Sequence, residues 1–320
     1  MKYFRYYPGW IQMILFLLIC LTFLYTGVMM TQYLLPKFTG FEMSEIAGIK
    51  PSSSPALIHT SMVINGFLNM CMYMLSGLVF AYLSHPSMGE YLGLRKPGSY
   101  VQLVFVVLLI MGAQPLVEAL TYGISLFKFS PETMAEQKAS EDVTKAFLTM
   151  HSPLDFFRAF ATIAITPALG EEFFFRGVLM RYATRIFRSP VRGIIFSAFI
   201  FAISHSNLFG LPAIFLAGCI LGAIYYITGS LWASVLAHLF FNGSQVVLAY
   251  MATFNPALKN FLENDSNAAG FIYLGVGTAL FTIGYLGLQK FKTPLPDNWT
   301  DDFRNEVNED SFSDPTEDNK

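Results

Sequence analysis

Hydrophobic residues in this sequence collect in long blocks, and short polar stretches separate one block from the next. A helix of about 17–25 mainly apolar residues is long enough to cross the hydrocarbon core of a bilayer. By this measure the pattern predicts eight transmembrane helices, at residues 9–30, 57–83, 100–125, 154–178, 193–209, 211–228, 230–252 and 269–288. The expected fold class is an all-α polytopic membrane protein.

Composition supports this fold class. Hydrophobic residues make up 54% of the 320 residues and charged residues 13%, about half the charged fraction usual for globular proteins. The formal net charge of −2 excludes the strongly basic surface that is typical of nucleic-acid-binding proteins. The expected partners are therefore the lipid bilayer and molecules associated with it, with no nucleic acid.

The cationic residues predict the orientation of the helices. With eight spans, the segments on the side of the N-terminus hold twelve Lys and Arg residues, whereas the opposite side holds six Lys residues and no Arg. The loop from Arg181 to Arg192 contributes four of the arginines. Because short cytoplasmic loops are enriched in Lys and Arg, both termini are predicted to be cytoplasmic. An integral protein of the cell inner membrane is expected.

The same pattern divides the chain into four parts. Residues 1–150 hold the first three transmembrane helices and their loops, residues 151–252 hold helices four to seven, and residues 253–292 hold the last helix. Residues 293–320 are rich in Asp and Glu and poor in apolar residues. Such a segment buries too little surface to offset the entropy lost on ordering, so a disordered acidic cytoplasmic tail is predicted.

Three ionisable residues interrupt the fourth predicted span. Glu171, Glu172 and Arg176 lie in its second half, where three charged, lipid-facing side chains would cost about 8–10 kcal/mol on the insertion scale. They must therefore face protein or water. Glu172 and Arg176 are four residues apart and share one helix face. Glu171 is rotated by about 100° from Glu172, so one arginine does not readily serve both carboxylates.

Two further predicted spans each contribute a histidine. His205 lies in the fifth span, one turn after Phe201, and His238 shares a helix face with Asn242 in the seventh. Counted at about 1.5 Å per residue from the predicted cytoplasmic ends, Glu171, His205 and His238 reach similar depths of about 10–20 Å. The spacing predicts that these polar residues converge on one site within the membrane.

The motifs that contain these residues resemble those of the CPBP family of intramembrane proteases (CAAX protease and bacteriocin-processing, also called the Abi family). That family includes the type II CAAX prenyl endopeptidases, and its motifs are EExxxR, FxxxH and HxxxN on successive core helices. Here they read Glu171-Glu172-Phe-Phe-Phe-Arg176, Phe201-Ala-Ile-Ser-His205 and His238-Leu-Phe-Phe-Asn242. The likeness covers roughly residues 155–250. It implies a conical polar cavity formed by the core helices, within a protease core at residues 151–252.

The resemblance also implies roles for the residues. Glu171 and His205 would hold and deprotonate the attacking water, and His238 and Asn242 would stabilise the oxyanion. Glu172, Arg176 and Phe201 would support the site. Peptide hydrolysis needs a base near the operating pH and donors aimed at the developing negative charge, which these residue types supply. The expected activity is endopeptidase cleavage of a membrane-associated protein or peptide, and nothing in the sequence indicates that this substrate is prenylated.

Two alternatives stay open at this point. In a zinc-dependent version of the same protease, Glu171, Glu172, His205 and His238 would be the candidate ligands. No HExxH motif is present, and a mechanism without a cofactor is favoured. In the other alternative, the protein is a non-proteolytic membrane scaffold or transporter that uses the same polar cavity, because carboxylates and histidines within spans are also typical of proton-coupled transport.

Overall fold

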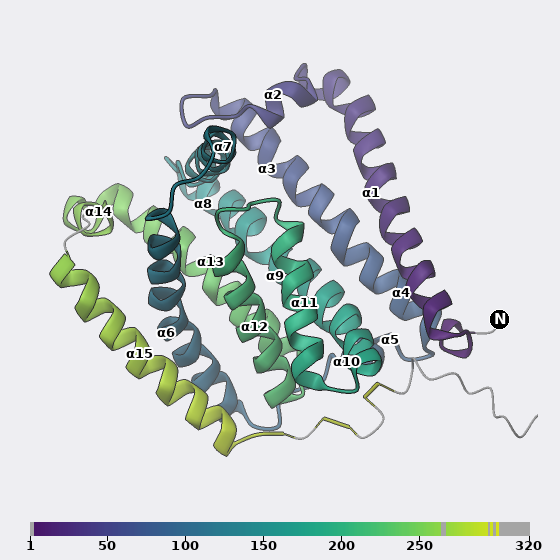
Figure 1. Ribbon diagram of the computed structural model, residues 1–320. Coiled ribbons are helices and arrows are strands. Elements are labelled where there is room, and N and C mark those ends of the chain that lie inside the picture. Colours follow the sequence, from purple (N-terminus) through teal and green to yellow (C-terminus); the bar gives the residue numbers. More distant parts are fainter. Residues whose placement is uncertain (1–2, 264–266, 294, 297–298, 301–320) are drawn as a thin grey trace, which may run out of the picture.

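The computed structural model describes residues 3–263, 267–293, 295–296 and 299–300. Across these residues the structure is helical and contains no strand (Figure 1). The prediction of an all-α polytopic fold is confirmed. The helices with ten or more residues are α1 (Gly9–Thr39), α3 (Pro55–Asn69), α6 (Tyr100–Ser125), α7 (Pro131–Phe147), α11 (Pro190–Ser204), α12 (Leu211–Thr228), α13 (Leu231–Phe254) and α15 (Asn267–Lys290).

Several shorter elements join end to end into longer helices. α3 continues through the π-helical turns η2 (Met70–Leu75) into α4 (Ser76–Ser84). The elements of the second such helix are α8 (Pro153–Ala159), η3 (Phe160–Ile165), α9 (Thr166–Glu171), η4 (Glu172–Met180) and α10 (Arg181–Phe187). The remaining short elements are η1 (Phe4–Tyr6), α2 (Met43–Ala47), α5 (Met88–Leu92) and α14 (Pro256–Glu263).

Six helices within the described residues are long and apolar enough to cross a membrane. They correspond to the first, second, third, sixth, seventh and eighth predicted spans. The fourth predicted span coincides with the α8–α10 helix, which carries buried charges. The fifth coincides with α11, whose 15 residues extend over about 22 Å, less than the roughly 30 Å of a hydrocarbon core. Six of the eight predicted spans thus coincide with described helices that have the length and composition expected of a span, and the total of eight stays a prediction.

The helix in the predicted fifth span is shorter than predicted and ends at Ser204 instead of residue 209. His205 forms its C-cap, and Ser206 adopts a left-handed backbone conformation with φ of 50°. Asn207 then accepts a hydrogen bond from the backbone N–H of Gly210 (2.8 Å), immediately before α12 begins. His205 therefore lies at the end of a helix and its side chain is exposed.

The long helices lie side by side, with α1 at one edge of the bundle and α15 at the other (Figure 1). α15 packs along α6, where a Cβ atom on Gly112 would overlap the backbone of Phe281 and Gly277. Glycine therefore permits the close helix contact that small residues commonly provide within membranes. The helix that carries Glu171 lies inside the bundle, between the α3–α4 helix and α13.

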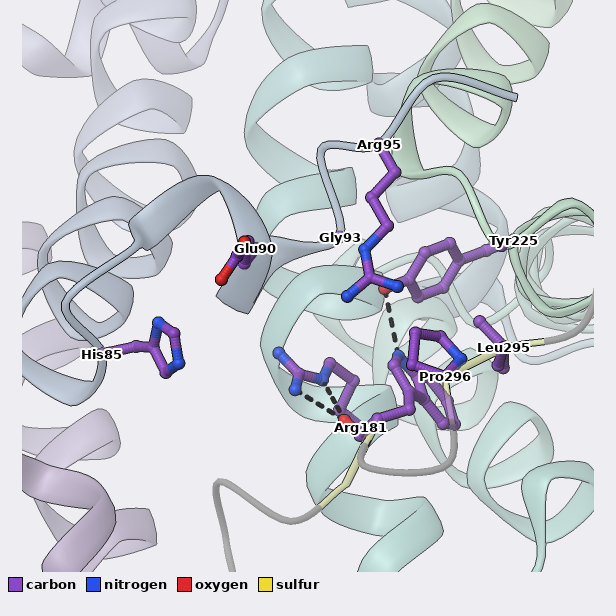
Figure 2. Close-up of a pocket in the computed structure, with 10 residues that line it drawn as sticks. His85, Glu90, Gly93, Arg95, Arg181, Tyr225, Leu295 and Pro296 are labelled. Carbon is purple, nitrogen blue, oxygen red and sulfur yellow. Dashed lines mark hydrogen bonds between the residues drawn. The ribbon is translucent and has the colours of Figure 1, made fainter. Parts of the chain in front are cut away.

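Beyond α15, Leu295, Pro296 and Trp299 help to line a pocket of about 60 Å³ (Figure 2). Arg181 donates two hydrogen bonds to the backbone carbonyl of Trp299, at 2.8 and 2.6 Å. The Trp299 indole N–H donates to the Tyr225 hydroxyl at 3.2 Å. These contacts hold part of the segment that composition alone predicts to be disordered. Residues 301–320, most of the predicted acidic tail, lie outside the described residues.

Candidate active site

The helix from α8 to α10 positions the predicted carboxylates. Glu171 is the last residue of α9 and Glu172 is the first of η4, so the pair lies where an α-helical segment passes into π-helical turns. Pro167 lies within the first two residues of α9 and donates no backbone hydrogen bond. π-Helical turns are rare and frequent at functional sites, and here they lie directly before and after α9.

Glu172 is fully buried and has three side-chain partners. Arg176 Nη1 donates to its Oε1 at 2.6 Å, and the Ser234 hydroxyl donates to its Oε2 at 2.6 Å. His238 Nδ1 lies 2.9 Å from the same Oε1. The predicted pairing of Glu172 with Arg176 is therefore present. These partners satisfy the carboxylate well enough to account for a charge at 0% exposure.

Arg176 is also buried, at 1% exposure. Besides its bond to Glu172, its Nη2 donates to the Gly218 carbonyl at 3.0 Å, and its guanidinium lies 4.7 Å from the centre of the Phe201 ring. The two charges and the phenyl ring thus form a compact unit that joins α12 and α11 to the helix that runs from α8 to α10. A buried ion pair with these additional contacts restrains the three helices relative to one another.

Glu171 has a different environment from its neighbour. Its side chain is buried at 6% exposure, and its Oε1 accepts a hydrogen bond from Asn69 Nδ2 at 3.0 Å. Its Oε2 lies 3.8 Å from His238 Nε2 and makes no hydrogen bond within the described part of the chain. A buried oxygen in that state requires an explanation, and a catalytic role is one of the few available. Glu172 thus accepts hydrogen bonds on both oxygens, whereas Glu171 keeps one oxygen for other interactions.

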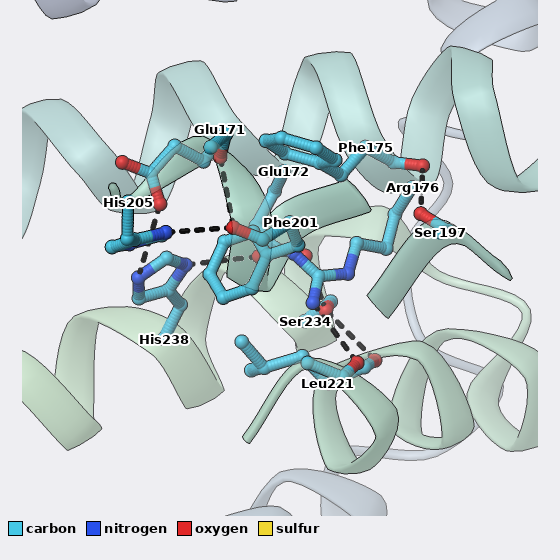
Figure 3. Close-up of polar contacts among 12 residues, drawn as sticks. Glu171, Glu172, Phe175, Arg176, Ser197, Phe201, His205, Leu221, Ser234 and His238 are labelled. Carbon is cyan, nitrogen blue, oxygen red and sulfur yellow. Dashed lines mark hydrogen bonds and ion pairs between the residues drawn. The ribbon is translucent and has the colours of Figure 1, made fainter. Parts of the chain in front are cut away.

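Each of the two histidines makes a hydrogen bond through its Nδ1 atom. His238 Nδ1 faces Glu172, which as an ionised carboxylate accepts hydrogen bonds and donates none, so this nitrogen carries the proton. His205 Nδ1 lies 2.7 Å from the Phe201 carbonyl and is likewise the donor. Each ring therefore leaves its Nε2 for other interactions. The rings of His205 and His238 lie 4.7 and 6.1 Å from that of Phe201 (Figure 3).

Asn242 lies one turn after His238 on α13, as its spacing predicts. One N–H of its amide donates to the Ile163 carbonyl at 3.0 Å. A carboxamide nitrogen carries two N–H donors, so the second donor is still available. The described contacts of Asn242 are thus with η3, on the helix that carries Glu171.

Sequence reasoning did not find two of the residues that complete this site. Asn69 is a polar residue within the predicted second span, and Ser234 lies on α13 four residues before His238. The cost of a polar side chain inside a bilayer draws attention to Asn69. The sequence, however, gives equal weight to Asn65, which is exposed in the structure. Only the folded arrangement shows that Asn69 reaches a residue 102 positions away.

The candidate zinc ligands do not fit a metal site. Among the described residues, no three His, Cys, Asp or Glu side chains are arranged to hold a metal ion. A zinc site needs at least three such ligands at about 2.0–2.3 Å from one point. Glu172 is directed to Arg176 and Ser234 instead, and the ring nitrogen of His238 nearest to Glu172 donates to it.

Comparison with known families identifies the segment that holds this site. Residues 153–244 match the family model described as Rce1-like, type II CAAX prenyl endopeptidase Rce1-like. The matched segment, 92 of the 320 residues, is similar to an Rce1-like domain. No curated protein and no solved structure matches the chain. The domain runs from α8 to α13 and contains all seven residues predicted for the site, whereas Asn69 lies outside it.

This match supports, for the segment that holds the site, the class of protein that the motifs indicate. At the level of the family, the Rce1-like domain is that of a CAAX-protease-like intramembrane endopeptidase. With the apolar helices described above, the chain is an integral membrane protein in a lipid bilayer. The family resemblance inferred from the three sequence motifs is thereby confirmed.

Proposed function

We propose that this protein hydrolyses a peptide bond of a membrane-associated protein or peptide, with water activated by Glu171 and His205. The observation that carries the proposal is the buried Oε2 of Glu171, which lies 3.8 Å from His238 Nε2 and makes no hydrogen bond within the described residues. A carboxylate oxygen in this state is suited to accept a proton from water. Its neighbour Glu172 is less suited, because both its oxygens already accept hydrogen bonds from buried donors.

The attacking water binds between Glu171 Oε2 and His205 Nε2. As the water oxygen attacks the scissile carbonyl carbon, one proton passes to Glu171 and a tetrahedral oxyanion forms. Collapse of this intermediate breaks the C–N bond, and the proton held by Glu171 passes to the leaving amine. The carboxylate is thereby regenerated, and no covalent enzyme intermediate is needed. General acid–base catalysis of this kind contributes about 10²–10⁴-fold to a rate.

His238 and Asn242 stabilise the oxyanion. The second N–H of Asn242 is available for this purpose, since Ile163 uses only one. His238 donates from Nε2 when that nitrogen is protonated, and Glu172 at its Nδ1 balances the added charge. Donors fixed in advance are effective because they need no reorganisation as the charge develops.

Substrate reaches the site, in this proposal, through a conical polar cavity that opens toward the cytoplasmic half of an inner membrane. The support is the excess of Lys and Arg in the segments at the end of the bundle where α1 begins and α15 ends, which the positive-inside rule assigns to the cytoplasm. A protease with this geometry acts on substrates that lie in or on the cytoplasmic leaflet.

Cleavage by purified protein tests the proposal. Wild-type protein in liposomes is expected to cut at least one of a panel of membrane-anchored peptides, which includes matched prenylated and unprenylated versions of a CAAX peptide. His205→Asn is expected to lower the cleavage rate by at least about a hundredfold, because asparagine lacks the imidazole that orients the water. Cleavage at the same rate by the variant contradicts the mechanism and favours a transporter or scaffold.

Metal removal gives a separate test. We propose that no metal takes part, because Glu172 is bound to Arg176 and to His238 Nδ1, and the Nδ1 of His205 is bound to a backbone carbonyl. Prolonged treatment with a chelator is expected to leave the cleavage rate unchanged. Metal analysis of the treated, active protein is expected to find far less than one metal ion per chain. Stoichiometric zinc whose removal and restoration track activity would contradict this mechanism.

A further inference from the structure

A residue outside the Rce1-like domain reaches the carboxylate at its centre. Asn69 is the last residue of α3, and its Nδ2 donates to Glu171 Oε1 at 3.0 Å. Figure 3 shows the Glu171 carboxylate on the side of the site that faces the two imidazoles. The two oxygens of this carboxylate thus have different surroundings, since Oε1 is held by Asn69 and Oε2 is left toward His238.

The backbone is shaped to allow this contact. Gly170 precedes Glu171, and a Cβ atom at this position would lie 3.0 Å from Asn69 Oδ1 and 3.4 Å from the backbone nitrogen of Met74. Such a distance is shorter than carbon normally keeps from these atoms. Glycine therefore lets α9 approach the junction of α3 and η2 closely enough for the Asn69 side chain to span the gap.

The same helix face makes a second contact with the site. Tyr73 lies four residues after Asn69 and is buried at 7% exposure. Its ring packs against Phe175 at 5.4 Å, on the helix that carries the carboxylates. The α3–η2 helix therefore contacts the helix that carries Glu171 through Tyr73 as well as through Asn69.

We infer that Asn69 is a positioning residue for the proposed base Glu171. A carboxylate on three rotatable bonds samples several orientations, and a hydrogen bond to one oxygen restricts them. With Oε1 held by Asn69, Oε2 is directed toward His238 and the attacking water. Residues that orient a catalytic group in this way typically contribute 10–100-fold. This inference rests on the proposed function and extends the site beyond the family-matched segment.

The test compares substitutions at Asn69 with a matched control on the same helix. Asn69→Ala removes the side chain, and Asn69→Asp keeps its shape but replaces the donor with an oxygen. Asn65→Ala is the control, because Asn65 is an exposed asparagine one turn earlier on α3. In the liposome assay, both Asn69 variants are expected to lower kcat by about 10–100-fold with KM within twofold of the wild-type value. Asn65→Ala is expected to leave both constants unchanged.

The outcomes separate positioning from packing and from the proposed function. If Asn69 only packs, the isosteric Asn69→Asp retains wild-type kcat, and the inference is overturned. It is also overturned if the loss appears in KM alone, or if both Asn69 variants fail to fold while the control folds. If wild-type protein and every variant are equally inactive, the proposed function itself fails. Wild-type cleavage that Glu171→Gln abolishes and Asn69→Ala leaves intact refutes the positioning role alone.

Discussion

Replacing Glu171 by glutamine is expected to lower kcat/KM for peptide cleavage by at least about a thousandfold. Glutamine has nearly the shape of glutamate, but its amide does not accept the proton that attacking water must lose. The side-chain carbonyl can still accept the Asn69 hydrogen bond that Glu171 Oε1 accepts at 3.0 Å. The variant should therefore fold normally and fail at the chemical step, with KM little changed.

The measurement pairs the cleavage assay with thermal unfolding in detergent. Glu141→Gln is the matched control, because it makes the same substitution at an exposed glutamate on α7, and wild-type activity is expected for it. Glu171→Gln protein with an unchanged unfolding midpoint and no cleavage supports the role of Glu171 as the base. Retention of more than a tenth of the wild-type kcat/KM would show that another group accepts the proton.

The different surroundings of the two adjacent carboxylates explain why only one is assigned to the chemistry. Glu172 is bound by Arg176, Ser234 and His238, so protonating it would weaken contacts that join its helix to α13. Glu171 has one donor on one oxygen, and a proton on the other oxygen disrupts no hydrogen bond among the described residues. Sequence spacing predicted the Glu172–Arg176 pair, but the full set of partners became evident only in the folded structure.

The sequence predicts the helices of this fold well, because long apolar blocks have few alternatives in a bilayer. It predicts the ends of helices less well where no Gly or Pro marks them. α11 ends at Ser204, and the sequence after it, His205-Ser206-Asn207, contains neither residue. The left-handed conformation of Ser206 is set by the connection to α12 instead of by local preference.

Contacts between distant segments are the other feature that the sequence does not reveal. Asn69 and Asn65 are the same residue type one turn apart, yet Asn69 is partly buried and bonds Glu171, whereas Asn65 is exposed. Trp299 lies in a segment whose acidic composition predicts disorder, but its carbonyl and indole bind Arg181 and Tyr225. Neither local propensity nor hydropathy predicts such contacts, because the contacts depend on how the helices pack against one another.

Replacing Arg176 by methionine is expected to destabilise the protein by about 3–5 kcal/mol. Methionine fills much of the same volume, so the main effect is electrostatic. The variant leaves the fully buried Glu172 carboxylate without its cation, although the bonds from Ser234 and His238 remain. It also removes the contacts with the Gly218 carbonyl and the Phe201 ring. Reversible unfolding in detergent measures the change in the free energy of unfolding.

A second substitution distinguishes loss of charge pairing from loss of packing. Glu172→Gln combined with Arg176→Met removes both charges, so no unpaired charge is buried, and the double variant is expected to be more stable than Arg176→Met alone. Arg192→Met is the control at an exposed arginine on α11, where a change within about 0.5 kcal/mol is expected. A double variant no more stable than Arg176→Met would show that packing and the Gly218 bond, not the unpaired carboxylate, account for the loss. In that case Arg176 stabilises the packing of α12 against the helix that runs from α8 to α10, and its ion pair with Glu172 contributes little to the free energy of unfolding.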